Sequence, residues 1–380
     1  MVFPNGFTEL LQASTGRADE VVRALGGAPS VSIRLNPAKL TACPFPDATP
    51  VPWSPYGYLL KERPVFTLDP LFHAGCYYVQ DSSAMFVGHV FREMTAGLGG
   101  GCRVLDLCAA PGGKTTDLAA SLRERFGGNF TLLANEVMRG RYAILRSNLE
   151  IWGDERVGCV SRDPSAFGGD PIFDVILADV PCSGEGMFRK DPQALAEWSL
   201  STVDFCAARS KRILADIWPA LKPGGLLLYS TCTFNHLEND DTVEWIAEEL
   251  GADVLPLKPF PPVVNTRYGQ VLLPGAVPGE GQYVAALRKR GLADTLAADP
   301  FLLFKAERPA FSDAARDPLV DVDCATALRY LHGDAIVLPE GAPIGPVVIG
   351  YEGHPLGPAK NLGRRCNNLY PKSRRIRMDV

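Results

Sequence analysis

Between about residues 100 and 290, short apolar runs alternate with segments whose apolar residues recur at helical spacing. Residues 201–221 show the helical spacing clearly, because Val203, Ile213 and Ile217 fall on one face. We predict further helices over 114–126 and 140–153, and strands over 103–108, 130–136, 157–163, 173–182, 224–234 and 282–289. Strands that are nearly all apolar, alternating with amphipathic helices, predict a parallel sheet covered on both faces.

The flanking regions have a different texture. Residues 1–95 combine two short helical patterns, "FTELLQAS" and "ADEVVRALG", with a strand-like run and a segment rich in proline and aromatic residues. After a polar, proline-containing stretch, the last 65 or so residues offer short strands interrupted by glycine and proline. We therefore predict an N-terminal α+β domain over 1–95, an α/β domain over 96–290, a linker over 291–315 and a β-rich domain over 316–380.

Composition indicates a globular protein of the cytoplasm. Apolar residues make up 46% of the chain and charged residues 21%. No run approaches the 18 apolar residues of a membrane-spanning helix, and the first residues lack the basic and apolar regions of an export signal. The ten cysteines are scattered without a C-x-x-C pair, which favours reduced thiols.

Charge is unevenly distributed along the chain. The net charge is −5, yet residues 359–380 hold seven Lys or Arg residues and one Asp. A basic tail on an otherwise acidic protein suggests contact with a polyanion such as RNA. A solvated face or a frayed terminus explains the same charge equally well.

Two cysteines follow buried strands of the predicted sheet. Cys182 ends "FDVILADVPC" three residues after Asp179, and Cys232 lies in "GGLLLYSTCTF". Ligands of such sheets bind outside the carboxyl ends of the strands, so both thiols belong to the functional edge. Taken singly, each cysteine is more simply a buried apolar residue. The five histidines offer no zinc-binding spacing with these cysteines, so we predict no metal site.

The first turn of the α/β domain, "DLCAAPGGKTTDLAA", predicts a cofactor loop. A strand, small residues, two glycines and a helix allow backbone amides to approach a ligand closely. The loop matches neither G-x-G-x-x-G nor the phosphate-binding P-loop. Glu136 and Asp163 end the next two predicted strands and could face the ribose and the adenine of an adenosine. Each could also be a helix N-cap or a solvated turn residue.

Four motifs together resemble the Sun-type RNA (cytosine-5)-methyltransferases, most closely the bacterial branch that modifies 16S ribosomal RNA. They are "DLCAAPGGKT", "NEVMRGRY", "ADVPCSGEGMFRKDP" and "YSTCTFNHLEND". The resemblance extends upstream to "VPWSPYGYLL" and "CYYVQDSSAM", and downstream to "GHPLGPAKNLGRRCNNLYP", which is similar to the PUA-like RNA-binding module of that branch. It implies an α/β, Rossmann-like S-adenosylmethionine-dependent methyltransferase sheet between a small N-terminal α+β domain and a C-terminal β-rich PUA-like domain.

The resemblance also implies the cofactor, the substrate and the site. The cofactor is S-adenosylmethionine and the partner is ribosomal RNA, free or within the small subunit. Cys232 is the implied nucleophile, Cys182 the thiol that releases the product, and Asp179 the contact to cofactor and base. The implied cofactor residues are Cys108, Ala109, Ala110, Pro111, Gly112, Gly113, Lys114, Glu136, Asp163 and Asp179. We assign RNA contacts to Lys190, Lys360, Arg364 and Arg365.

The chemistry explains the need for two thiols. Carbon 5 of cytosine is a poor nucleophile, and addition of a Cys232 thiolate at carbon 6 makes it reactive. After methyl transfer the enzyme must leave carbon 6, which is the implied step of Cys182. Residues 270–283 depart from the family pattern, since Gln270, Gly275, Gln282 and Tyr283 replace expected basic or aromatic positions. This casts doubt on RNA contacts along that segment only.

Two alternatives stay open on the sequence. One is the same cytosine-5 methylation on transfer RNA, which the catalytic motifs do not distinguish. The other is a catalytically idle RNA-binding assembly factor, although the intact trio of Cys182, Cys232 and Asp179 argues against it. We expect a monomer that needs neither a metal ion nor a membrane.

Overall fold

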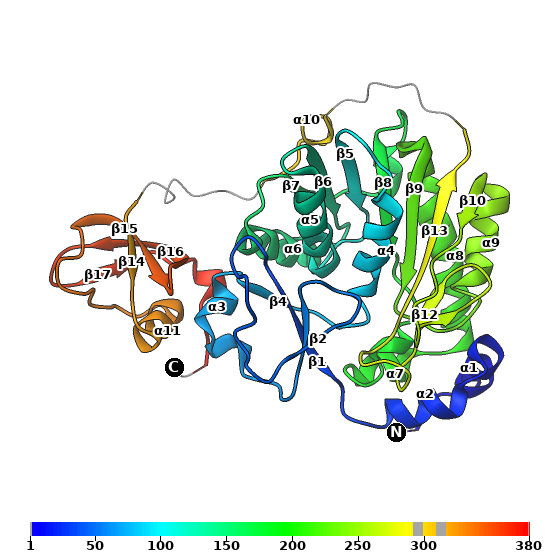
Figure 1. Ribbon diagram of the computed structural model, residues 1–380, viewed down its shortest axis with the longest axis horizontal. Helices are drawn as coiled ribbons and strands as arrows, with labels where there is room; N and C mark the ends of the chain where they lie inside the picture. Colours follow the sequence, from blue (N-terminus) through cyan, green and yellow to red (C-terminus); the bar gives the residue numbers. More distant parts are fainter. Residues whose placement is uncertain (1, 292–298, 309–316, 379) are drawn as a thin grey trace.

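The computed structural model describes residues 2–291, 299–308, 317–378 and 380. Its described strands form three sheets, of which the largest has nine strands in the order β11-β12-β13-β9-β8-β5-β6-β7, with β10 paired to β13 (Figure 1). The strands are β5 (Cys102–Asp106), β6 (Phe130–Asn135), β7 (Val157–Val160), β8 (Phe173–Asp179), β9 (Leu221–Thr231), β10 (Ala252–Leu255), β11 (Val264–Asn265), β12 (Gln270–Leu272) and β13 (Gln282–Lys289).

Helices cover both faces of this sheet, as the apolar strands predicted. Alternate residues of β8 point to opposite faces, with Val175 in one apolar cluster and Ile176 in the other. The Val175 face packs against α4 (Phe86–Thr95), α5 (Gly113–Phe126) and α6 (Arg139–Trp152). The Ile176 face packs against α8 (Leu200–Ile217) and α9 (Asp240–Glu249), with α7 (Pro192–Glu197) nearby (Figure 1). The prediction of a Rossmann-like α/β sheet is confirmed.

The sheet is mixed, however, and not parallel throughout. Strands β5 to β9 run parallel, whereas β13 pairs antiparallel with β9, β10 and β12. The prediction of a parallel sheet was therefore wrong for residues 282–289. The reason is that β13 is buried on both faces, and an apolar run of this kind looks the same in either direction.

The N-terminal region has two parts, a small sheet and a pair of helices that pack on the large domain. Strands β1 (Val31–Leu35), β2 (Thr49–Pro50), β3 (Gly57–Leu60) and β4 (Tyr77–Val79) form a four-stranded antiparallel sheet. Helix α3 (Pro70–His73) precedes β4 in the chain and lies beside it. Helices α1 (Phe7–Thr15) and α2 (Ala18–Leu25) lie apart from this sheet, under the α9 side of the large domain (Figure 1). Their buried residues belong to the same apolar cluster as α8 and α9.

The C-terminal module is a small sheet with one helix. Strands β14 (Leu319–Asp321), β15 (Gly345–Tyr351), β16 (His354–Asn361) and β17 (Cys366–Asn368) lie in that order, and α11 (Cys324–His332) packs on β15. Its apolar core is continuous with the N-terminal sheet, because Tyr330 and Leu331 share a cluster with Ile33 and Leu71. The N-terminal sheet and the C-terminal module thus form one packed unit.

Residues 299–308 lie within the predicted linker and pack on the large domain. Helix α10 (Pro300–Phe304) buries Phe301 and Phe304, and Cys159 pairs with Glu307 through backbone hydrogen bonds. Of the predicted linker, residues 292–298 and 309–315 lie outside the described residues. Across the described ranges, no helix has the length and apolar character needed to cross a membrane.

Candidate active site

The two thiols at the carboxyl edge of the sheet face each other. Asp179, at the end of β8, is paired in register with Ser230 of the parallel strand β9, so the segments that follow the two strands emerge side by side. The Sγ atoms of Cys182 and Cys232 lie 3.2 Å apart, and both residues are free cysteines with partial exposure. The hydrogen bond to Cys232 and burial raise the pKa of the Cys182 thiol. Cys182 therefore keeps its proton near neutral pH.

Asp179 is held by three side chains. Its Oδ1 accepts hydrogen bonds from Ser230 Oγ at 2.7 Å and Gln282 Nε2 at 3.2 Å, and its Oδ2 lies 2.9 Å from Lys114 Nζ. Burial lowers the pKa of Lys114, whereas the negative charge of Asp179 raises it. The net result is that the pKa of Lys114 lies above its ordinary value. Lys114 is thus a cation fixed beside the thiols, whereas the sequence assigned it only to the cofactor loop.

The predicted cofactor loop, Cys108 to Lys114, connects β5 to the N-terminus of α5. Gly112 caps this helix with φ of +111°, a conformation that a residue with a Cβ rarely adopts. The side chain of Arg141 donates to the Ala110 carbonyl at 2.7 Å, and that of Asn148 donates to the Pro111 carbonyl at 2.8 Å. The loop is therefore fixed from the side of α6.

Glu136 and Asp163 differ in their surroundings. Glu136 is buried at 3% exposure, and its Oε1 accepts from the Met138 amide at 2.9 Å. Its Oε2 accepts no hydrogen bond from the described protein, although Arg141 Nη1 lies 3.3 Å away. Asp163 is exposed and caps the short 3-10 helix Pro164–Phe167 by accepting from Ser165, which lowers its pKa. The N-cap alternative therefore describes the observed hydrogen bonds of Asp163.

Asn135, which the sequence analysis did not single out, ties these segments together. Its side-chain amide donates to the carbonyls of Leu107, at 3.1 Å, and Arg162, at 3.0 Å. The ends of β5, β6 and β7 are thereby joined by one buried side chain. The sequence did hold a signal for this residue, because an asparagine ends an apolar strand directly before Glu136.

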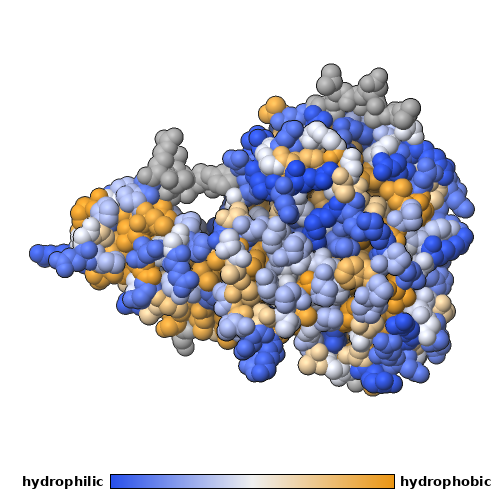
Figure 2. Space-filling view, in the orientation of Figure 1, coloured by the Kyte–Doolittle hydropathy of each residue, from blue (hydrophilic) through white to orange (hydrophobic). Residues whose placement is uncertain are grey.

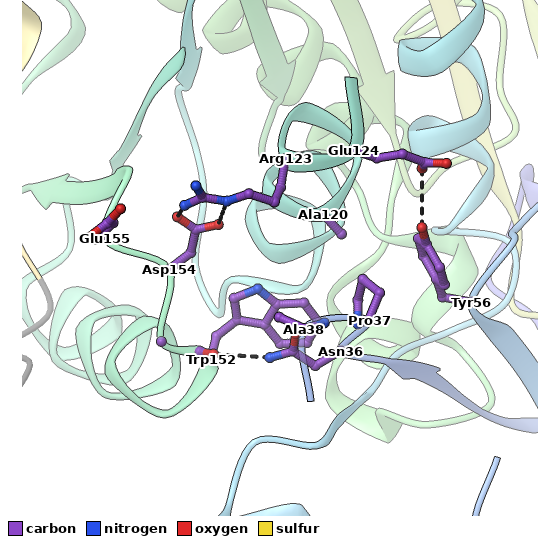
Figure 3. Close-up of a pocket in the computed structure, with 11 residues that line it drawn as sticks. Asn36, Pro37, Ala38, Tyr56, Ala120, Arg123, Glu124, Trp152, Asp154 and Glu155 are labelled. Carbon is purple, nitrogen blue, oxygen red and sulfur yellow. Dashed lines mark hydrogen bonds and ion pairs between the residues drawn. The ribbon is translucent and has the colours of Figure 1, made fainter. Parts of the chain in front are cut away.

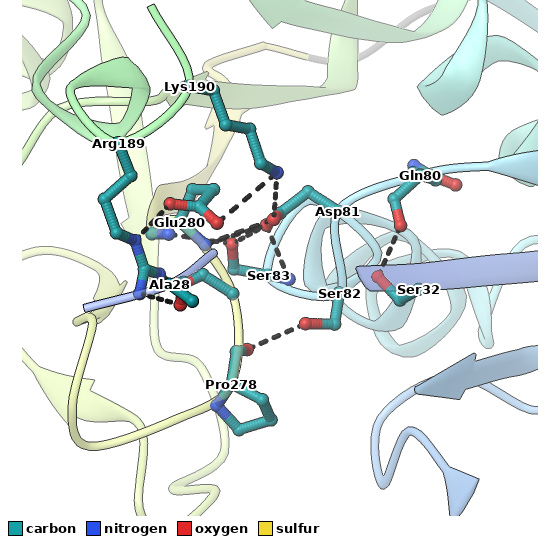
Figure 4. Close-up of polar contacts among 12 residues, drawn as sticks. Ala28, Ser32, Gln80, Asp81, Ser82, Ser83, Arg189, Lys190, Pro278 and Glu280 are labelled. Atoms are coloured by element: carbon teal, nitrogen blue, oxygen red, sulfur yellow. Dashed lines mark hydrogen bonds and ion pairs between the residues drawn. The ribbon is translucent and has the colours of Figure 1, made fainter. Parts of the chain in front are cut away.

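The predicted RNA contacts lie in two separate regions. Lys190, near the Cys182 segment, is 3.2 Å from Asp81 and 3.4 Å from Glu280. Figure 4 shows Glu280 between Lys190 and Arg189, whose guanidinium also contacts the Gly279 carbonyl. Lys360, Arg364 and Arg365 are exposed on β16 and the turn after it.

The surface of the C-terminal module combines apolar and basic residues. Figure 2 shows apolar side chains over this module in the left part of the view, and its exposed apolar residues include Val337, Ile344 and Leu369. Part of the basic tail is structural, because Arg374 donates to Ser147 at 3.1 Å and pairs with Glu150 on α6. The tail therefore joins the module to the large domain as well as offering charge.

A cavity of about 470 Å³ lies elsewhere, between the N-terminal sheet and the large domain. Trp152 lines this cavity. Four of the polar residues that line the cavity bind one another, since Arg123 pairs with Asp154 and Tyr56 donates to Glu124 (Figure 3). Arg123 is nine residues beyond Lys114 along α5, which corresponds to roughly 14 Å of helix. The cavity is therefore separate from the thiols.

Comparison with known proteins places the chain in a family. A family model described as 16S rRNA methyltransferase RsmB/F matches residues 99–288. Models of the N-terminal domain of 16S rRNA methyltransferase RsmF and of the RsmF PUA domain match residues 3–82 and 318–376. The ribosomal RNA small subunit methyltransferase F of an Enterobacter species is 31% identical over 90% of this chain and 88% of its own length. The chain belongs to the RsmB/F family.

Further proteins are similar to this chain in sequence or in fold. Ribosomal RNA small subunit methyltransferase F of Escherichia coli is 34% identical over 79% of this chain, which spans 66% of that relative. A methyltransferase homologue from Pyrococcus horikoshii has the same fold, with a TM-score of 0.61 and 26% identity over 74% of this chain and 93% of its own. NSun6 from the same organism, solved with SFG, gives a TM-score of 0.62 at 18% identity over 76% and 99% of the two chains.

The sheet edge fits S-adenosylmethionine, the cofactor of this family. The buried Oε2 of Glu136 is an acceptor without a hydrogen bond among the described residues, as a ribose hydroxyl requires. The Gly112 turn brings backbone close to the same edge. No group of three or more His, Cys, Asp or Glu side chains within the described ranges is arranged to hold a metal ion.

Proposed function

We propose that this chain transfers a methyl group from S-adenosylmethionine to carbon 5 of a cytosine in ribosomal RNA of the small subunit. The observation that carries the proposal is the pair of thiols 3.2 Å apart at the ends of two parallel strands, beside Asp179. Membership of the RsmB/F family and the match to a PUA domain support ribosomal RNA as the substrate.

For the cofactor, we assign binding to the loop from Cys108 to Lys114 and to Glu136. The free Oε2 of Glu136 would accept from a ribose hydroxyl, and the small loop residues would let the cofactor approach the backbone. Asp163 stays a proposed adenine contact, with its carboxylate already engaged by Ser165. When bound, S-adenosylmethionine supplies an electrophilic methyl group.

Cys232 is the proposed nucleophile. As a thiolate it would add to carbon 6 of the target cytosine, which makes carbon 5 able to attack the methyl group. The target base has to be splayed from its neighbours to reach a thiol at this depth. We propose that Cys182, which keeps its proton in the resting site, donates a hydrogen bond to the Cys232 thiolate before addition, since the two sulfurs lie 3.2 Å apart. After methylation, the proton on carbon 5 leaves to a base while the bond between carbon 6 and the Cys232 sulfur breaks, and the electrons of that bond return to the sulfur. We assign Cys182 to this release step.

Asp179 and Lys114 are proposed to hold the edge of the base. The Asp179 carboxylate can accept from the exocyclic amine of cytosine while Ser230 and Gln282 keep it oriented. The Lys114 ammonium provides fixed positive charge where the ring gains electron density. Both groups are in place before the substrate arrives, so little reorganisation accompanies the reaction.

The remaining assignments concern the partners. We propose that Lys190 contacts the RNA near the thiols and that Lys360, Arg364 and Arg365 contact it on the C-terminal module. We also propose a monomer without a metal ion, because one chain provides both thiols, Asp179 and Glu136. The site of action we propose is the cytoplasm, because the substrate is ribosomal RNA.

Methyl transfer from labelled S-adenosylmethionine tests the proposal. The purified protein is incubated with 16S ribosomal RNA, assembled small subunits and bulk transfer RNA, and 5-methylcytosine is mapped by bisulfite sequencing. We expect label at defined cytosines of the ribosomal substrates, loss of that label in Cys232→Ala, and retention in the exposed-cysteine control Cys324→Ala. Label confined to transfer RNA, or unchanged transfer by Cys232→Ala, would contradict the proposal.

A further inference from the structure

Two buried carboxyl groups lie on the segments that carry the thiols and take no part in the reaction described above. Glu185 follows Cys182 by three residues and is 2% exposed, and Glu238 follows Cys232 by six residues and is fully buried. A carboxyl group is costly to bury unless its oxygens are hydrogen-bonded. The hydrogen bonds of these two residues therefore show what holds them.

Glu238 belongs to the Cys232 segment but binds the Cys182 segment. Its Oε2 accepts from the backbone amide of Ser183 at 2.8 Å, and its Oε1 accepts from the Ser183 hydroxyl. Asn235 Nδ2 donates to the same Oε1 at 2.8 Å. Ser183 directly follows Cys182, so Glu238 fixes the backbone next to that thiol.

Glu185 makes the reverse connection. It belongs to the Cys182 segment, and its Oε2 accepts from the backbone amide of Phe234 at 2.6 Å. Its Oε1 accepts from Asn235 Nδ2 at 2.9 Å and from Trp198 Nε1 at 3.2 Å. The Gly186 amide also donates to the Cys232 carbonyl at 2.8 Å. Each segment thus carries a carboxyl group that accepts a hydrogen bond from a backbone amide of the other segment.

We infer that Glu185 and Glu238 form a reciprocal clamp that sets the position of Cys182 relative to Cys232. They are positioning residues, and the inference rests on the thiol roles proposed above. Helix capping does not account for Glu238, because Asn239 is the N-cap of α9. The clamp keeps Cys182 within reach of the Cys232 sulfur after methylation, when the enzyme has to leave the base.

The consequence is a defined kinetic defect. In Glu238→Gln, the side-chain oxygen can still accept from the backbone N–H of Ser183. The side-chain NH2 group then faces the Asn235 Nδ2 donor, so one hydrogen bond is lost and the Cys182 segment loses its fixed position. The release step should then slow while addition by Cys232 continues. We expect steady-state turnover to fall by about 10- to 100-fold, with more protein trapped on RNA, as in Cys182→Ala.

The experiment compares wild type with Glu238→Gln, Glu185→Gln, Cys182→Ala and the double variant Cys182→Ala/Glu238→Gln. For each protein, turnover and the fraction of covalent protein–RNA adduct on a denaturing gel are measured with 16S ribosomal RNA and S-adenosylmethionine. Thr242→Val is the matched control, because Thr242 is also fully buried but donates within its own segment, to Leu237. Thermal melting accompanies every variant.

A clamp that acts through Cys182 predicts more adduct in both single glutamate variants and no further effect of Glu238→Gln when Cys182 is already absent. If turnover and adduct fall together in the glutamate variants, the inference is overturned. Lost stability alone would have that effect, as it would in Thr242→Val. So would independent effects of Cys182→Ala and Glu238→Gln. If wild type methylates no RNA and Cys182→Ala traps none, the proposed function itself has failed, and the two failures are distinguishable.

Discussion

At the scale of single residues, the proposed reaction depends on charge fixed beside the thiols. The ion pair of Lys114 with Asp179 is the clearest case, because it links the cofactor loop to the β8–β9 edge. Lys114→Met should lower kcat by about 100-fold, the size typical of losing one preorganised electrostatic group, with little change in melting temperature. Lys222→Met is the matched control, since Lys222 pairs with Asp174 at the opposite end of the same two strands. Equal losses of kcat in the two variants would contradict the role of Lys114.

A second prediction at this scale concerns pH. Burial raises the pKa of Glu238 to about 7 from its ordinary 4.5, and the neighbouring Glu185 adds to the effect. A carboxyl group with a raised folded-state pKa contributes stability that is present below about 4.5 and is lost as the pH rises through about 7. The loss corresponds to about 3 kcal/mol in the free energy of unfolding.

Urea unfolding at pH 4.5 and pH 8 checks this prediction. Glu238→Gln should lose less stability than wild type between the two pH values, because its amide does not titrate. Asp106, whose pKa burial also raises to about 7, keeps a similar slope in both proteins, so the difference between them isolates Glu238. Parallel pH profiles would show that Glu238 titrates near its ordinary value.

At the scale of elements, helix α1 supports the segment that follows Cys182. Phe7 packs on Phe188 at 5.2 Å and edge-on against Trp198 at 5.5 Å between ring centroids. Phe7→Ala should cost about 3–5 kcal/mol of unfolding free energy, as expected for a buried phenylalanine. Phe205→Ala, at 63% exposure on α8, is the control and should change stability little. A loss of similar size in both variants would contradict the packing.

Elements also show what the sequence could predict. The apolar runs located the six main strands, although 173–182 extended past the end of β8 because Val180 is buried as well. The sequence could not predict the direction of β13, the docking of α1 and α2, or the packing of α10, since these depend on contacts distant along the chain.

In the candidate site, too, the sequence predicted what local motifs carry and not what depends on contacts distant along the chain. Cys182, Cys232 and Asp179 were predictable because strand-end motifs carry them. The partners of Asp179 were not all predictable: Gln282 was interpreted only as a departure from the family pattern, yet it donates to Asp179. Glu185 and Glu238 lie inside the quoted motifs, but only the fold shows that each binds the other segment.

At the scale of the whole molecule, the C-terminal module is built into the fold. Its core residues Tyr330 and Leu331 share one apolar cluster with Leu71 and Tyr77 of the N-terminal region. A chain ending at residue 308 should therefore expose this apolar surface, bind more of the dye ANS and melt at a lower temperature. A shortened chain that melts like the full chain, with no added dye binding, would show that the module is only tethered.

In the proposed mechanism, Cys232 attacks the base and Cys182 acts in its release. The most direct test of this mechanism is the mass of the protein after incubation of Cys182→Ala with ribosomal RNA and S-adenosylmethionine, followed by nuclease and protease digestion. We expect a peptide containing Cys232 that carries a methylated cytidine nucleotide, and no such peptide from Cys182→Ala/Cys232→Ala. A nucleotide absent from Cys232 in Cys182→Ala, while wild type still methylates the RNA, would contradict the two-thiol mechanism.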